Sequence, residues 1–78
     1  MFYVSAEFNV GDDWEGMDRR LATIAGRPGD ERSCHSATEW GQRITRRTLV
    51  WRVKGFAEAT ELRKMLCVPG VCATLREV

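Results

Sequence analysis

Phe-Tyr-Val-Ser-Ala-Glu-Phe, residues 2–8, alternates apolar and polar side chains along its whole length. The apolar set points to one side and consists of Phe2, Val4, Ala6 and Phe8. Because successive side chains of a strand point to opposite faces of a sheet, this period of two predicts a strand with one buried face. Residues 48–54, Thr-Leu-Val-Trp-Arg-Val-Lys, repeat the pattern and predict a second strand of the same kind. Its buried face comprises Leu49, Trp51 and Val53.

The segment that follows the first strand predicts a helix. Gly11 breaks the strand, and Asp12 with Glu15 three residues later is typical of an N-cap and its capping-box partner. Apolar side chains then recur at helical spacing, at Trp14, Met17, Leu21 and Ile24. Gly26 and Pro28 predict the end of this helix, since glycine is common just after a helix and proline cannot extend one.

The middle of the chain carries weaker signals. Residues 27–31 have the Gly, Pro and Asp content of a loop, and the polar run 33–42 predicts only a weak strand. We expect a turn between Gly41 and Arg46, before the strand at 48–54.

The C-terminal part predicts one more helix and one more strand. Residues 57–67 carry apolar side chains at helical spacing, at Ala59, Leu62, Met65 and Leu66. Pro69 stops that helix. Residues 71–78 then predict a strand whose inward side chains are Val71, Ala73 and Leu75.

The order strand, helix, strand, strand, helix, strand defines the fold class. Right-handed crossovers place both helices on the same face of one sheet, which predicts an α+β, two-layer sandwich with a four-stranded antiparallel sheet. The strands at 2–8 and 48–54 are then central, and the polar strand at 33–42 lies at an edge. This βαββαβ pattern resembles ferredoxin-like domains, including the ending of helix, Pro69-Gly70-Val71 and edge strand. The resemblance covers residues 1–78 as a single domain.

Composition limits the classes of function. Lys and Arg number 12 against 11 Asp and Glu, so the net charge of +1 gives no overall attraction to nucleic acid or membranes. No apolar stretch is long enough to cross a bilayer, and the N-terminus lacks a signal-peptide pattern. We therefore expect a cytoplasmic protein. Its 3 cysteines, an odd count, favour reduced thiols over a disulfide framework.

Metal binding and catalysis are not indicated. Cys67 and Cys72 flank a turn and suggest a redox pair or half of a metal site with Cys34 and His35 as further ligands, but the spacing C-x₄-C is not that of a common zinc site. The fold also places residues 34 and 72 at opposite edges of the sheet. With a single histidine, no Gly-rich phosphate loop and no cofactor motif, we expect neither an enzyme nor a bound metal or cofactor. A ligand pocket between sheet and helices stays as an alternative, and it requires polar groups that point inward.

Local charge suggests two surfaces that bind a partner. Carboxylates gather at the start of the first helix, at Asp12, Asp13, Glu15 and Asp18. Cations gather in the middle of the chain, at Arg46, Arg47, Arg52 and Lys54. Either set could contact a partner protein, and the basic segment 43–54 could instead contact nucleic acid through phosphates. The uncovered sheet face, with Tyr3, Val50 and Val78, also suggests a homodimer, formed through this face or by pairing of either edge strand of the sheet.

In its length, its Arg-rich and Lys-poor composition and its charge asymmetry, the chain looks like small phage-encoded anti-CRISPR proteins. That resemblance implies a non-enzymatic inhibitor in the cytoplasm of the host cell. It implies binding to a subunit of a type I CRISPR effector complex, so that target DNA cannot engage. One of the two charged sets would then be the contact surface. The alternative is a nucleic-acid-binding or regulatory module.

Overall fold

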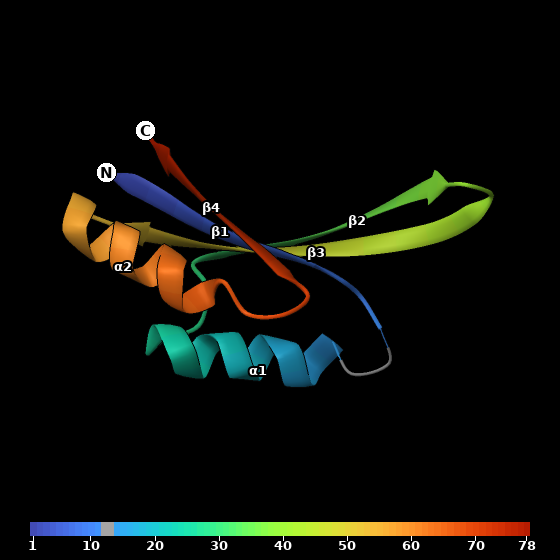
Figure 1. Cartoon of the computed structure of the whole chain (residues 1–78), viewed down its shortest axis with the longest axis horizontal. Helices are drawn as coiled ribbons and strands as arrows, with labels where there is room; N and C mark the ends of the chain where they lie inside the picture. The colour runs from blue at the N-terminus through green and yellow to red at the C-terminus, as the bar shows by residue number, and fades with distance from the viewer. Residues whose placement is uncertain (12–13) are drawn as a thin grey trace.

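The computed structural model describes residues 1–11 and 14–78 as one sheet with two helices. In chain order, the elements are β1 (Phe2–Asn9), α1 (Trp14–Ala25), β2 (Glu31–Glu39), β3 (Gln42–Val53), α2 (Phe56–Leu66) and β4 (Val71–Glu77). The strands pair antiparallel in the order β2-β3-β1-β4. Both helices lie on one side of the sheet (Figure 1). This is the predicted α+β architecture, consistent with a ferredoxin-like fold.

The core is built from the alternating side chains of the two central strands and one stripe of each helix. Buried residues from the described ranges are all apolar, and they are Val4, Ala6, Phe8, Leu21, Leu49, Trp51, Ala59, Leu62 and Leu66. Trp51 is 0% exposed. Its indole N–H donates to the carbonyl oxygen of Arg27 at 3.0 Å, so the burial of the ring leaves no unsatisfied donor. The predicted inward faces of residues 2–8 and 48–54 are confirmed.

One prediction about α2 is wrong. Met65 was expected on the buried stripe, but its side chain is 43% exposed. The buried stripe of α2 runs through Ala59, Leu62 and Leu66, which have spacings of three and four residues. Met65 lies at the flank of this stripe, where the sheet no longer covers it.

The loop between α1 and β2 is held against β3 by Asp30. Its carboxylate accepts hydrogen bonds from Arg27 Nη1 at 2.7 Å and from the backbone N–H of Arg52 at 2.7 Å. Arg27 Nη2 in turn donates to the carbonyl oxygen of Arg52 at 2.6 Å. Gly26, with φ of +81°, ends α1 in the left-handed conformation that glycine adopts without strain. These bonds fix the entry of the chain into β2.

Asp30 makes the stability of the fold dependent on pH. Its backbone hydrogen bond from Arg52, followed by the side-chain bond from Arg27, lowers the pKa of Asp30 below its ordinary value. A lowered pKa in the folded state means a stabilising contribution that is present above about pH 4 and is lost as the pH falls through the folded-state pKa. We expect Asp30→Asn to lower the free energy of unfolding at pH 7, and this deficit to shrink as the pH falls to about 2.

Urea denaturation of the wild type and Asp30→Asn across that pH range measures the difference. Glu61→Gln is the control, because Glu61 is an exposed carboxylate of α2 without an ion pair in the described part of the chain. A deficit of equal size at every pH contradicts the role assigned to the Asp30 charge.

The connection between β2 and β3 differs from the prediction. The turn was expected between Gly41 and Arg46, but β2 ends at Glu39 and β3 begins at Gln42. Glu39 and Gln42 are register partners, so the loop consists of two residues, Trp40 and Gly41. Both have positive φ, +53° and +75°, as in a type I′ hairpin turn. β3 is therefore much longer than the predicted strand at 48–54, while β2 overlaps most of the predicted 33–42 but begins two residues earlier and ends three residues earlier.

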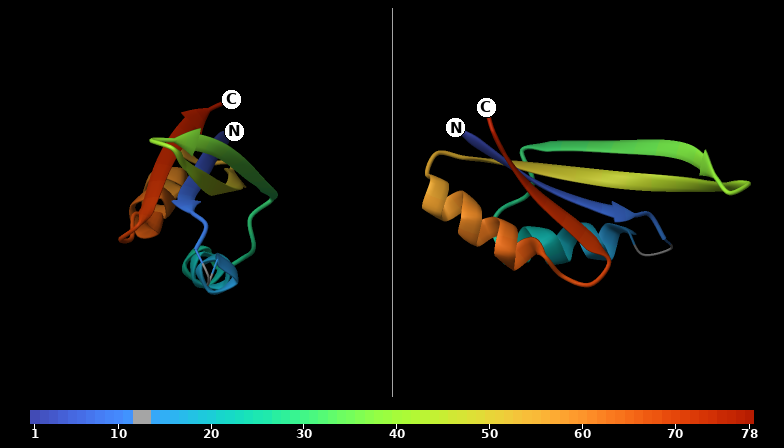
Figure 2. Two further views of the ribbon diagram at one scale, coloured as in Figure 1. Left: turned by 90° about the vertical axis from the view of Figure 1, so that its right-hand side faces the viewer. Right: turned by 45° about the horizontal axis from the view of Figure 1, so that its top comes forward.

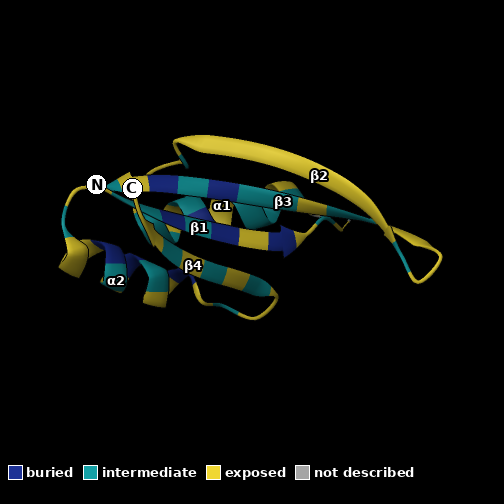
Figure 3. Cartoon of the chain, turned by 90° about the horizontal axis from the view of Figure 1, so that it is seen from above, coloured by how far each residue is buried: buried dark blue, intermediate teal, exposed yellow. Residues whose placement is uncertain are grey.

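The outer half of this hairpin extends beyond the rest of the sheet. β1 pairs with β3 only as far as Arg46, followed by one bond from the N–H of Val10 to the carbonyl oxygen of Thr45 at 2.7 Å. The hairpin arm, residues 36–45, therefore has strand neighbours only within itself (Figure 2). It gives the molecule a longest dimension of 41 Å, against 24 and 20 Å in the other directions. Figure 3 shows β2 exposed along almost its whole length.

Candidate interaction surface

The predicted acidic surface is only partly available to a partner. Asp12 and Asp13 lie outside the described residues. Glu15 is exposed in the first turn of α1. Asp18 lies one turn further along α1, and its carboxylate faces the sheet, where it pairs with Arg47. The structure therefore removes Asp18 from the set of free carboxylates.

Arg47 and Asp18 form a shielded ion pair between β3 and α1. Arg47 Nε donates to both carboxylate oxygens of Asp18 at 2.8 Å, and Nη2 lies 2.7 Å from Oδ2. The two side chains are only 12% and 20% exposed. The hydrogen bond to Asp18 raises the pKa of Arg47.

Two further contacts hold the Arg47 guanidinium in place. It lies 4.7 Å from the centroid of the Trp14 ring, a cation–π geometry, and its Nη1 donates to Sγ of Cys34 at 3.2 Å. Arg47 thus joins α1, β2 and β3. Each of its three guanidinium nitrogens has a partner within the fold, so its first role is structural.

Two of the other predicted cations, Arg46 and Arg52, lie on the open face of the sheet. Arg46 lies 3.3 Å from Glu39 and 3.9 Å from Glu7. Arg52 Nη2 lies 2.7 Å from Glu31, and the hydrogen bond to that carboxylate raises the pKa of Arg52. Lys54 follows the end of β3 and is exposed. Since residues 46 and 47 point to opposite faces, the structure does not bring the four predicted cations together, and carboxylates accompany three of them.

The centre of the open face carries an aromatic ring between two arginines. Tyr3 of β1 is a register neighbour of Arg52 and of Arg76. The two guanidinium carbons lie 6.0 and 5.9 Å from the Tyr3 ring centroid. Because the two arginines pack across the strands against the Tyr3 ring, the open face of the sheet is less apolar than the sequence suggested.

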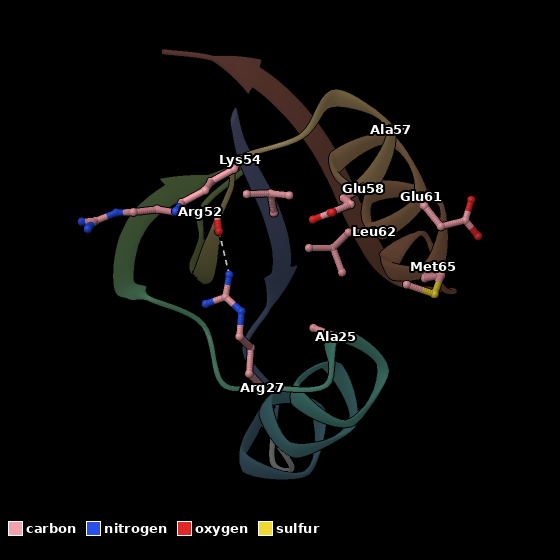
Figure 4. A pocket seen from close by; sticks show the side chains of 10 residues that line it. Ala25, Arg27, Arg52, Lys54, Ala57, Glu58, Glu61, Leu62 and Met65 are labelled. Carbon is pink, nitrogen blue, oxygen red and sulfur yellow. Dashed lines mark hydrogen bonds between the residues drawn. The ribbon is translucent and has the colours of Figure 1, made fainter. Parts of the chain in front are cut away.

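A cleft of about 770 Å³ opens between the end of α1, the end of β3 and α2 (Figure 4). Its apolar lining includes Ala25, Val53 and Leu62. Of the polar side chains at its rim, Arg27 bonds to Asp30 and to the carbonyl oxygen of Arg52, Figure 4 shows the Arg52 side chain directed away from the cleft, and Lys54, Glu58 and Glu61 are exposed. No side chain of the described residues offers a buried polar group to orient a substrate there.

The cysteines lie apart from one another and do not gather with other metal ligands. Cys34 is on β2 at one edge of the sheet, while Cys67 and Cys72 flank the turn into β4 at the other edge. All three are free and exposed. Within residues 1–11 and 14–78 there is no group of three His, Cys, Asp or Glu side chains that could hold a metal ion.

The most exposed large apolar side chain in the described structure was not predicted as a site residue. Trp40 is 100% exposed at the tip of the hairpin arm. Arg43, on the adjacent part of β3, is also exposed and has no carboxylate partner among the residues described. The sequence contained one signal for this turn, a glycine directly after Trp40. The predicted turn began at this glycine rather than at Trp40, because two-residue turns favour Asn or Asp before Gly.

The fold and surface together define a small α+β domain of the ferredoxin-like type with a projecting hairpin. Comparisons with protein-family models, curated proteins and solved structures find no match. None of the described helices is long and apolar enough to span a membrane. The functional argument therefore rests on the surface itself.

Proposed function

We propose that this chain is a non-enzymatic protein-binding domain that inserts its hairpin arm into a concave surface of a partner protein, with Trp40 as the anchor. The observation that carries the proposal is the position of Trp40: fully exposed, at the tip of a two-residue turn, with φ of +53°. Trp and other large aromatic residues dominate the binding energy of many protein interfaces.

Trp40 is unfavourable for the fold on two counts. A residue with a Cβ in the left-handed region costs about 1–2 kcal/mol. Exposure of the whole indole ring also leaves a large apolar surface in water. Asparagine at this turn position reduces the first cost and avoids the second. Since the fold gains nothing from Trp40, its benefit is expected in binding.

The rest of the hairpin arm suits a protein interface. Beside the charged Glu39 and Arg43, the arm carries several uncharged side chains, at Ser36, Ala37, Thr38, Gln42 and Thr45. Small polar side chains around an aromatic anchor adapt their hydrogen bonds to a partner surface. A two-stranded arm that is paired along its whole length also loses little entropy when it binds.

Affinity capture from a bacterial lysate tests the proposal by comparing the wild type with Trp40→Ser. We expect a defined protein that the wild type retains and the variant loses, while both have the same far-UV circular dichroism spectrum. Retention of the same proteins by both forms rejects the proposed function.

The narrower proposal is an inhibitor of a type I CRISPR effector complex, of the kind that phages encode and that acts in the host cytoplasm. It is supported by the length and Arg-rich composition of the chain, and by a two-stranded arm that projects beyond the sheet. Adding the protein to a purified type I effector should abolish binding of labelled target DNA. Unchanged DNA binding at saturating protein rejects this narrower proposal for that effector.

The nucleic-acid alternative has one supporting feature, because an exposed tryptophan can also stack on a base. Against it, carboxylates accompany Arg46, Arg47 and Arg52, which leaves only Arg43 and Lys54, among the cations of segment 43–54, without an ion pair to the described residues. A mobility shift of labelled single-stranded DNA that weakens steeply with salt supports the alternative. No binding at low salt removes it.

A further inference from the structure

We infer that the outer edge of β2 is the docking site for an extended acidic segment of the partner protein, which pairs with β2 as an additional strand of the sheet. This inference rests on the proposed function and names how the partner is held. In this arrangement Trp40 anchors the tip of the arm, while backbone hydrogen bonds along β2 hold the segment.

The backbone groups that face outward along β2 follow from the register. Thr45 accepts a hydrogen bond from the N–H of Val10, so its backbone polar groups point toward β1. Ser36 is the register partner of Thr45 and therefore directs its own N–H and C=O away from β3. Because this orientation alternates, the same holds at Arg32, Cys34 and Thr38. β2 is the terminal strand of the sheet, so these groups have no strand neighbour.

The middle of this edge, residues 33–38, lacks the usual protection against pairing with another chain. Natural edge strands are commonly guarded by proline, charged side chains, a bulge or a covering helix. Residues 33–38 contain no proline, lysine, arginine or carboxylate, and the register of β2 with β3 is continuous from Glu31 to Glu39 without a bulge. Eight of the nine residues of β2 are exposed. The opposite edge differs, since β4 is shorter and α2 packs against it.

The charges beside this edge favour an acidic segment. The two carboxylates of β2, Glu31 and Glu39, pair with Arg52 and Arg46. Arg32 and Arg43 are exposed, and neither has an ion pair in the described part of the chain. The free charge of the hairpin is therefore positive.

The two free arginines also set a spacing for the partner. Arg43 is the register partner of Thr38, so it shares a sheet face with Arg32. Along β2 they are separated by the distance between positions 32 and 38, about 20 Å at the rise of a strand. Two carboxylates on one face of an extended peptide, six residues apart, match this spacing. The regularly spaced, unpaired backbone groups favour a peptide over a phosphate backbone, which has no matching donors.

Titration of the isotope-labelled protein with a ten-residue peptide of alternating Val and Glu tests the inference by NMR. We expect amide shifts centred on Arg32, Cys34, Ser36 and Thr38, and hydrogen exchange at least ten-fold slower at these amides. A peptide of alternating Val and Lys should leave them unchanged. Equal shifts with both peptides, or shifts centred on β4, overturn the inference.

Two variants at one position separate the backbone contribution from the side chain. Ser36→Pro removes an outward N–H without removing a bond to β3, because proline is tolerated where the N–H of an edge strand faces solvent. Ser36→Ala is the matched control, since it loses the same 2.9 Å hydrogen bond to Thr45 Oγ1 but keeps the N–H. We expect Ser36→Pro to weaken binding of the Val-Glu peptide at least ten-fold, and Ser36→Ala to weaken it less than two-fold. Equal affinities overturn the inference.

Charge reversal gives a second variant if proline disturbs the arm. The double variant Arg32→Glu and Arg43→Glu should no longer bind the Val-Glu peptide and should bind the Val-Lys peptide instead. Unchanged preference for the acidic peptide overturns the inference.

Other occupants of the edge produce different signals. Concentration-dependent shifts of the same amides without peptide assign the edge to a second copy of the chain, as in the predicted homodimer, and overturn the inference. Salt-dependent shifts of the same amides with oligothymidylate in place of peptide also overturn the inference, because they assign the edge to nucleic acid.

The proposed function and the edge inference fail separately. If Ser36→Pro still captures the partner that Trp40→Ser loses, β2 is not the docking edge but the proposed function stands. If Trp40→Ser retains that partner, the proposed function fails, whatever the peptides do.

Discussion

Trp40→Asn is expected to stabilise the fold while weakening the partner complex at least ten-fold. Asparagine before glycine is the preferred pair for a type I′ turn, so the variant should raise the free energy of unfolding by about 0.5–1 kcal/mol. The same change removes the only fully exposed indole in the described structure. Loss of an aromatic anchor typically costs a complex about 2 kcal/mol or more. Opposite signs for stability and binding distinguish a functional side chain from a structural one.

Chemical denaturation measures the first effect, and titration against the captured partner measures the second. Trp40→Phe is the control, because it keeps an aromatic ring at the same backbone position and should retain most of the affinity. A Trp40→Asn protein that binds as tightly as the wild type removes Trp40 from the interface. A Trp40→Asn protein that is less stable shows instead that the indole supports the turn.

Arg47→Ala is expected to lower the free energy of unfolding by about 2–4 kcal/mol. The variant leaves the Asp18 carboxylate, which is 20% exposed, without its bidentate partner. It also removes the cation from the Trp14 ring. Removing one member of a shielded pair is costly because the other charge stays desolvated.

Arg46→Ala is the matched control for this effect, because it changes the same residue type at the adjacent position of β3. Arg46 points to the open face, and its side chain is 44% exposed. Exposed pairs of this kind contribute about 0–1 kcal/mol, so the control should stay close to the wild type. Urea denaturation of both variants measures the two losses in free energy of unfolding. Similar losses for the two would mean that the Arg47–Asp18 pair has no special role in the fold.

The fold could be predicted because its signals are local. Alternation at residues 2–8 and the stripe from Trp14 to Ile24 each require only a few neighbouring positions. A buried face imposes its period on the sequence, and Val4, Ala6 and Trp51 are all 0% exposed. Where a strand has few buried side chains, the sequence did not predict the strand. The segment 42–47 belongs to β3, but it lies largely outside the core and carries no apolar alternation.

The interaction surface was harder to predict because it depends on which side chains meet. Asp18 and Arg47 appeared in separate acidic and basic sets, yet the fold brings them within 2.7 Å. Their pairing across 29 residues of sequence has no local signal. Charge counts along the chain therefore overstated both surfaces.

The sequence by itself determined the order of the elements, the presence of both helices and the inward faces of the central strands. It could do so because the period of apolar residues shows which face is removed from water. Only the tertiary structure decided that Arg46 and Arg47 have opposite surroundings and that residues 36–45 extend beyond the sheet. It also decided that Trp40 is fully exposed at the tip of the hairpin arm. These properties depend on strand register and on what each strand lies beside, and both are set by contacts between distant segments.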